Sequence, residues 1–202
     1  GPVHTPVTLT VDDDKVQCPT AGFTTIQAAV DAAGPGDKIN VCRGAYPEAV
    51  SIGAGKDNLS LLSSTSQYAA VVRGGFTVKD GAQGVSIQRF DIEVPPAGTG
   101  IKVGESGGLA SATTLVRSNL INGGANGLKV ENGDAGTVRD NQVQGYTGNG
   151  ILVSPPPASP GSANVLENTL IGTPTSNGIV YLGDPMGVPL SGTVLSNQVS
   201  KN

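Results

Sequence analysis

The chain has 202 residues and a formal net charge of −4, and its 12 lysines and arginines are spread along it. This length predicts one domain, and the lack of a basic cluster predicts no nucleic-acid partner. The single histidine, His4, excludes histidine-based metal clusters and argues against a Ser-His-Asp triad. No apolar run approaches the roughly 18 residues that a transmembrane helix needs, so we expect no membrane span.

Residues 1–57 are expected to form an N-terminal cap built around one helix. Thr24 and Gln27 have the spacing of a capping box, in which side chains satisfy the free N–H groups at a helix start. The sequence Gly34-Pro35-Gly36 would end the helix. These signals predict a helix at about 24–33, with apolar residues at helical spacing at positions 23, 26, 30 and 33.

The two cysteines, Cys18 and Cys42, bracket this helix. We predict a disulfide between them, which would stabilise the cap by roughly 3 kcal/mol through closure of a loop. A chain with so few core residues fits an exported protein, where disulfides persist. Two buried free thiols are the alternative.

Three consecutive acids, Asp12, Asp13 and Asp14, precede the first cysteine. They could bind calcium, but adjacent side chains on an extended strand cannot all face one ion. We therefore expect a solvated turn at this point.

Residues 58–202 contain a repeat of about two dozen residues, the range in which stacked repeats are expected. Each copy has an aliphatic residue, then asparagine three positions later, then another aliphatic residue two positions after that. The copies are 116–121, 138–143, 165–170 and 194–199, and 87–92 matches with Phe90 in the place of the asparagine. A second element, glycine followed by short alternating strands, occurs at 100–103, 127–130, 150–153 and 178–181.

Short strands without room for a crossover helix predict a coil of parallel strands, with one turn per repeat and turns about 4.8 Å apart. Equivalent residues then lie above one another, and the asparagines form a ladder of amides at a buried bend. A leucine-rich repeat is excluded, because the position five residues before the asparagine is Thr114, Gly136, Ala163 or Gly192 rather than leucine.

These features resemble the right-handed parallel β-helix of the pectate-lyase-like superfamily, over nearly the whole chain. The segments 23–33, 36–37 and 44–48 are similar to the N-terminal cap of pectin methylesterases and related exported bacterial proteins. The resemblance implies an all-β fold in which the helix covers the first coil, and a secreted or cell-surface protein of bacterial origin. It does not determine the reaction, because many activities share this scaffold.

The catalytic motifs of the best-known members are missing. Pectin methylesterases carry a G-x-V-D-F-I-F-G segment that nothing here matches, and Asp91 lacks its frame. Pectate and pectin lyases carry W-x-D-H, which a chain without tryptophan cannot contain. The chemistry that remains is that of polysaccharide lyases that use lysine or arginine as the base, with a cation or calcium on the uronate carboxylate.

The column alignment provides candidates for such a site. Lys102 and Lys129 share one outward column, and Arg117 and Arg139 share another, with Asp140 beside the second arginine. The acids near the lysines, Glu105, Glu131 and Asp134, are candidate calcium ligands. Outward lysines and acids are also typical of an ordinary solvated face.

The coil at 128–141 is shorter than its neighbours, which carry long loops at 104–112 and 154–163. A short turn between long ones predicts a notch, with Glu131, Asn132 and Asp134 on its floor as substrate-binding residues together with Asp140. Aromatic platforms for sugars are few: Tyr68, Tyr146 and Tyr181 are the exposed candidates, and we expect Tyr181 to point inward.

Three functions follow. The first is a non-catalytic secreted or surface β-helix module that binds a glycan or a protein along its side. The second is a small polysaccharide lyase acting on uronate polymers by β-elimination through Lys102, Lys129, Arg117 or Arg139. The third is a structural spacer. No capping segment follows Val199, so we also expect self-association through the last coil.

Overall fold

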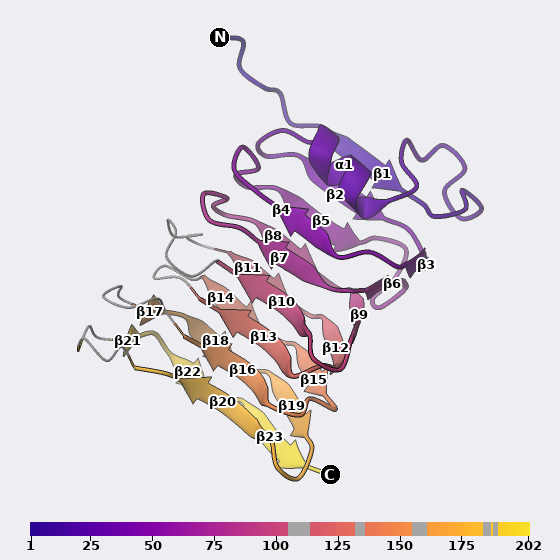
Figure 1. The fold of residues 1–202 in the computed structure, drawn as a ribbon. Helices are drawn as coiled ribbons and strands as arrows, with labels where there is room; N and C mark the ends of the chain where they lie inside the picture. The colour runs from indigo at the N-terminus through magenta and orange to yellow at the C-terminus, as the bar shows by residue number, and fades with distance from the viewer. Residues whose placement is uncertain (105–113, 132–135, 155–160, 184–186, 188–189) are drawn as a thin grey trace.

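The computed structural model describes residues 1–104, 114–131, 136–154, 161–183, 187 and 190–202. Parallel strands form a solenoid, and each turn contributes one strand to each of three long sheets (Figure 1). This arrangement confirms the predicted all-β parallel β-helix. The helix α1 lies at the N-terminal end of the solenoid, and β20, β22 and β23 lie at the other end (Figure 1).

The first sheet has eight strands. They are β1 (Thr8–Val11), β2 (Lys38–Val41), β5 (Ser60–Ser63), β8 (Ser86–Gln88), β11 (Leu115–Arg117), β14 (Thr137–Arg139), β18 (Asn164–Leu166) and β22 (Val194–Leu195). The second sheet has seven strands. They are β3 (Gly44–Tyr46), β6 (Ala70–Arg73), β9 (Asp91–Val94), β12 (Leu120–Gly123), β15 (Gln142–Gln144), β19 (Thr169–Gly172) and β23 (Gln198–Lys201).

The third long sheet has six strands, and a short pair of strands stands apart from the three. The six are β4 (Val50–Ile52), β7 (Phe76–Val78), β10 (Thr99–Val103), β13 (Asn126–Val130), β16 (Asn149–Val153) and β20 (Asn177–Tyr181). The pair is β17 (Gly161–Ser162) and β21 (Leu190–Ser191).

The strand register confirms the repeat alignment residue by residue. In the eight-stranded sheet Val116 pairs with Ile87 on one side and Val138 on the other, and Val165 and Val194 continue the column. A second column in the seven-stranded sheet runs through positions 92, 121, 143, 170 and 199. These side chains are buried except in the last turn, where Val194 and Val199 are each 51% exposed. The core is therefore the interior of the coil.

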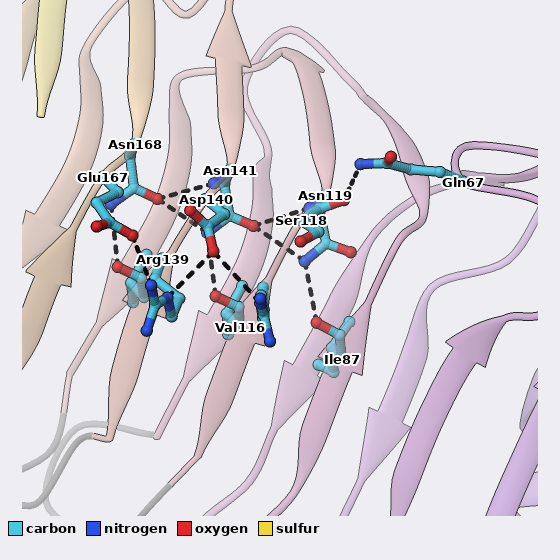
Figure 2. A network of polar contacts seen from close by, with 12 residues as sticks. Gln67, Ile87, Val116, Ser118, Asn119, Arg139, Asp140, Asn141, Glu167 and Asn168 are labelled. Atoms are coloured by element: carbon cyan, nitrogen blue, oxygen red, sulfur yellow. Dashed lines mark hydrogen bonds and ion pairs between the residues drawn. The ribbon is translucent and has the colours of Figure 1, made fainter.

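The asparagine ladder is present at the bend between the eight- and seven-stranded sheets (Figure 2). Asn141 accepts two hydrogen bonds at Oδ1, from the backbone N and the Nδ2 of Asn119 at 3.0 and 3.1 Å. Its own Nδ2 donates to the Val116 carbonyl and to Asn168 Oδ1, each at 3.0 Å. Asn197 continues the ladder by accepting from Asn168. Each side-chain amide thus satisfies backbone groups of the preceding turn and donates to the amide oxygen of the next asparagine.

The residue before each ladder position adopts a left-handed backbone conformation. Ser118, Asp140, Glu167 and Ser196 have φ between 54° and 57°, and Arg89, before Phe90, has φ of 67°. The left-handed conformation makes the sharp bend by which the chain passes from the eight-stranded to the seven-stranded sheet. It costs an L-residue about 1–2 kcal/mol.

The N-terminal helix α1 (Ile26–Ala32) is shorter than predicted, and its cap is Thr25 rather than Thr24. Thr25 Oγ1 accepts from Ala28 N at 3.2 Å. Gln27 does not complete a capping box. Its Oε1 accepts from Ser51 N at 2.8 Å and its Nε2 donates to Ser51 O at 3.1 Å, so its carboxamide pairs with β4 as a neighbouring strand would. The Gln27 side chain thus satisfies the free N–H and C=O groups of Ser51 on β4, the edge strand of the six-stranded sheet.

The predicted disulfide between Cys18 and Cys42 is present, with a Cα–Cα distance of 6.5 Å. The expected solvated turn at the three acids is wrong for Asp12, whose side chain is buried. Asp12 Oδ2 accepts from Cys18 N at 2.6 Å, and Asp13 Oδ2 accepts from Ala45 N at 3.0 Å. These acids hold the loop before the disulfide against the first coil.

Candidate functional site

Three of the predicted site residues, Lys102, Lys129 and Glu131, form a cluster of charged side chains on the outer face of the six-stranded sheet. Lys102 of β10 pairs in register with Lys129 of β13, so their side chains leave the sheet side by side. Glu131 follows β13, and its backbone N donates to Val103 O at 2.8 Å, which keeps the residue alongside β10. The strand pairing therefore brings two cations and one acid together from neighbouring turns.

Both ammonium groups contact the same carboxylate. Lys102 Nζ lies 3.2 Å from Glu131 Oε2, and Lys129 Nζ is paired with Oε1. The Glu131 side chain is only 10% exposed, whereas those of Lys102 and Lys129 are 36% and 28% exposed. Burial by itself would raise the pKa of Glu131, but the hydrogen bonds and charges of Lys129 and Lys102 outweigh it and hold the pKa below its ordinary value. The cluster carries a net charge of one cation.

The outward column that contains the lysines is otherwise uncharged. Thr77 precedes Lys102 and Leu152 follows Lys129 in register. Each ammonium group has three N–H donors. The contact with Glu131 uses one donor of each lysine and leaves the others for a ligand. The arrangement can therefore bind an anion at a position set by the sheet.

Two predicted residues of the notch, Asn132 and Asp134, and the calcium candidate Glu105 lie outside the described residues. Of the predicted calcium ligands only Glu131 is described, and its carboxylate is already neutralised by two ammonium groups. Calcium binding stays a prediction.

The structure separates the predicted arginines from the lysines. Arg117 and Arg139 lie on β11 and β14 of the eight-stranded sheet, and Asp140 accepts from both, at 3.3 and 3.1 Å (Figure 2). Arg139 Nη2 also contacts Glu167 at 2.5 Å. The carboxylates hold the pKa of Arg139 above its ordinary value. Glu167 was not among the sequence candidates, although it occupies the same turn position as Asp140.

This second network differs from the lysine cluster in its exposure. Glu167 and Arg117 are about half exposed, and the acids lie at the left-handed turn positions. Exposed ion pairs of this kind contribute little to stability, because water and salt screen them. We interpret the arginine network as a polar face of the coil rather than a site.

The tyrosines provide few exposed rings. The prediction that Tyr146 is exposed is wrong, because the side chain is buried under Gly150 and Gly172, where glycine leaves room for the ring. Tyr181 is half-buried and its hydroxyl donates to Ala163 O at 2.9 Å, in agreement with an inward orientation. Tyr68 sits at a turn with φ of 65°.

The stacked parallel turns, the asparagine ladder and the N-terminal helix define a parallel β-helix with a helical cap. The crystal structure of Escherichia coli YbhC is similar, with a TM-score of 0.64 and 12% identity, over 87% of this chain and 59% of YbhC. The structure of the PL6 family alginate lyase AlyGC has a TM-score of 0.43 and 11% identity, over 96% of this chain and 39% of AlyGC.

The similarity to YbhC shows the fold alone, because the sequence identity is only 12%. The chain spans less than two thirds of the length of YbhC. No protein-family model and no curated protein sequence matches it. Among the described residues, no helix is both long and apolar enough to cross a membrane.

Proposed function

We propose that the chain is a secreted or cell-surface β-helix module that binds an acidic glycan along its side without transforming it. The observation that supports this proposal is the convergence of Lys102 and Lys129 on Glu131 on one outward sheet face. The carboxylate balances one of the two positive charges, so the cluster keeps one in excess. A uronate carboxylate would contact the remaining N–H donors of the two ammonium groups.

The buried carboxylate is the organising element of this site. Long lysine side chains lose rotamer entropy when a ligand fixes them, and their shared contact with Glu131 holds them in place before the ligand arrives. Preorganisation of this kind lowers the cost of binding. The parallel register sets the spacing of the two lysines, because they occupy equivalent positions in adjacent turns about 4.8 Å apart.

A polysaccharide lyase is the second candidate function, and the fold supports it only in outline. β-Elimination needs a base that accepts the proton beside the uronate carboxylate. A lysine can do so only as the neutral amine, and both amines of this cluster are engaged with Glu131 as ion pairs. The geometry therefore favours binding over elimination. A protein ligand with a carboxylate at its surface would use the same contacts.

The location outside the cell is part of the proposal. The disulfide between Cys18 and Cys42 supports it, since such bonds persist in oxidising compartments. Calcium could bridge a uronate to acids near Glu131, and chelation would then weaken glycan binding.

The test is calorimetric titration of the chain with oligomers of galacturonate and of alginate, with and without calcium. Lys102→Ala and Lys129→Ala should each weaken binding about tenfold, the effect of losing one charge-assisted hydrogen bond. Lys38→Ala, which removes an exposed lysine from β2 on another sheet, is the matched control. A lack of binding to every acidic oligomer would overturn the proposal. A rise in the ultraviolet absorbance of unsaturated product would favour the lyase.

A further inference from the structure

A hollow of about 410 Å³ lies at the ends of β12, β15 and β19, three adjacent strands of the seven-stranded sheet. The lysine cluster belongs to the six-stranded sheet, so the hollow is a separate feature. The volume falls within the roughly 300–1,000 Å³ of small-ligand sites. The lining includes side chains of Asn122, Gln144, Ile171 and Thr173 and the glycines Gly123, Gly145 and Gly172.

Two carboxamides in the hollow are oriented by one carboxylate. Asn122 Nδ2 donates to Asp91 Oδ1 at 2.9 Å, and Gln144 Nε2 donates to Asn122 Oδ1 at 2.5 Å. A carboxylate can only accept, so Asp91 determines which way each amide points along this chain of bonds. The relay spans three adjacent strands: Asn122 pairs in register with Gln144, whereas Asp91 lies diagonally across from Asn122 on β9.

The chain of hydrogen bonds runs from Gln144 through Asn122 to Asp91, and the amide groups that it does not use are available to a ligand in the hollow. Each carboxamide has two N–H donors, and each uses one within the relay. Gln144 Oε1 receives no hydrogen bond from the described residues. The hollow therefore presents both donors and an acceptor at fixed positions.

The remaining lining determines what kind of ligand fits. None of the lining residues, which also include Asn202, has a charged side chain, so no lysine or arginine of the lining would pair with a uronate carboxylate. Ile171 pairs with Gln144 in register and adds an apolar surface beside the amides. Gly145 has φ of 68°, a left-handed conformation that favours glycine at this turn.

We propose that this hollow binds a neutral saccharide. Sugar hydroxyls both donate and accept, which matches the mixed donors and acceptor of Asn122 and Gln144. The C–H face of a sugar ring would contact Ile171. The site would bind uncharged units, and it does not depend on the lysine cluster.

The test is an NMR titration of the isotope-labelled chain with cellohexaose, maltohexaose and mannohexaose at millimolar concentration, with hexagalacturonate as the charged comparison. The side-chain NH₂ resonances of Asn122 and Gln144 should shift with at least one neutral oligosaccharide. Gln144→Ala and Asn122→Ala should weaken that binding about tenfold, whereas Gln142→Ala should not, because Gln142 lies outward on the same strand but outside the hollow.

A second arm separates this site from the acidic-glycan site. The double variant Lys102→Ala/Lys129→Ala should keep its neutral-sugar titration unchanged, whatever its effect on the acidic oligomers. The proposal is overturned if no neutral oligosaccharide shifts these resonances. It is also overturned if binding persists unchanged in Gln144→Ala, or if only hexagalacturonate shifts the resonances.

Discussion

Glu48 is bonded to Gln27 across the N-terminal cap: Glu48 Oε1 accepts from Gln27 N at 2.7 Å, and Oε2 accepts from Ile26 N at 2.9 Å. These are two of the free N–H groups at the start of α1. Glu48 follows β3, so the turn between the first strands of two sheets holds the helix by its N-terminal end. The helix and the turn at 44–48 are thus one structural unit.

We predict that Glu48→Ala lowers the free energy of unfolding by about 1–2 kcal/mol, since it leaves two helix donors without a partner. Chemical denaturation followed by circular dichroism measures the loss. Glu93→Ala is the control, because Glu93 forms an exposed pair with Arg73 at 2.6 Å and should change stability by less than about 1 kcal/mol. Equal losses in the two variants would refute a capping role for Glu48.

A second prediction concerns the pH dependence of the cap. Asp37 is buried and accepts from Val7 N, Gly34 N and His4 Nε2, at 2.8, 2.8 and 2.7 Å. Burial alone would raise the pKa of Asp37, but these hydrogen bonds outweigh it and hold the pKa below its ordinary value of 3.8. The stabilisation is therefore complete well above 3.8 and is lost as the pH falls through the lower, folded value.

The measurement is the free energy of unfolding of wild type and Asp37→Asn between neutral and strongly acidic pH. The variant should be less stable at neutral pH by about 1–3 kcal/mol, and the gap should narrow in acid. Asp31→Asn, at an exposed position on α1, should run parallel to wild type. A gap that stays constant into acid would contradict the assignment to the Asp37 charge.

The asparagine ladder predicts a graded effect of position. Asn141 makes four ladder hydrogen bonds between its neighbours, and its loss would strand buried groups on both sides. We expect Asn141→Ala to cost about 3 kcal/mol or more. Asn197→Ala should cost less, because Asn197 is half-buried and bonds to one neighbouring turn. Denaturant and thermal unfolding measure both losses. Equal destabilisation by Asn141→Ala and Asn197→Ala would argue against a dependence on position in the ladder.

The left-handed turn positions predict a specific tolerance. Ser118 has φ of 57°, and its backbone makes the hydrogen bonds of the turn: its N donates to Arg139 O at 3.2 Å and its carbonyl accepts from Gln67 Nε2 at 3.4 Å. Ser118→Val should destabilise by about 1–2 kcal/mol, since a β-branched side chain disfavours this conformation. Ser118→Gly should leave stability unchanged or raise it by up to about 1 kcal/mol, and Ser118→Asn should be nearly neutral. A neutral valine variant would contradict the strain argument.

The columns of the coil could be read from the sequence because stacking repeats the same environment in each turn. Val116, Val138 and Val165 occupy equivalent positions, so their identity carries the register. The cap and the site depend on contacts between different elements, which periodicity does not encode. Tyr146 was expected outside but fills space beside glycines of neighbouring strands. Lysines and arginines from the same turns separate because β10 and β13 belong to the six-stranded sheet, whereas β11 and β14 belong to the eight-stranded sheet.

Self-association through the last described turn stays a prediction. Val194 and Val199 continue columns that are buried in the preceding turns, yet each is 51% exposed on β22 and β23. Each side chain is already about half buried, so covering the rest would contribute about 1 kcal/mol each. We expect a concentration-dependent dimer in sedimentation equilibrium that Val194→Ser and Val199→Ser weaken. Val7→Ser, at a valine 49% exposed near the other end, is the control and should leave the dimer intact. A monomer at all concentrations would refute association through this edge.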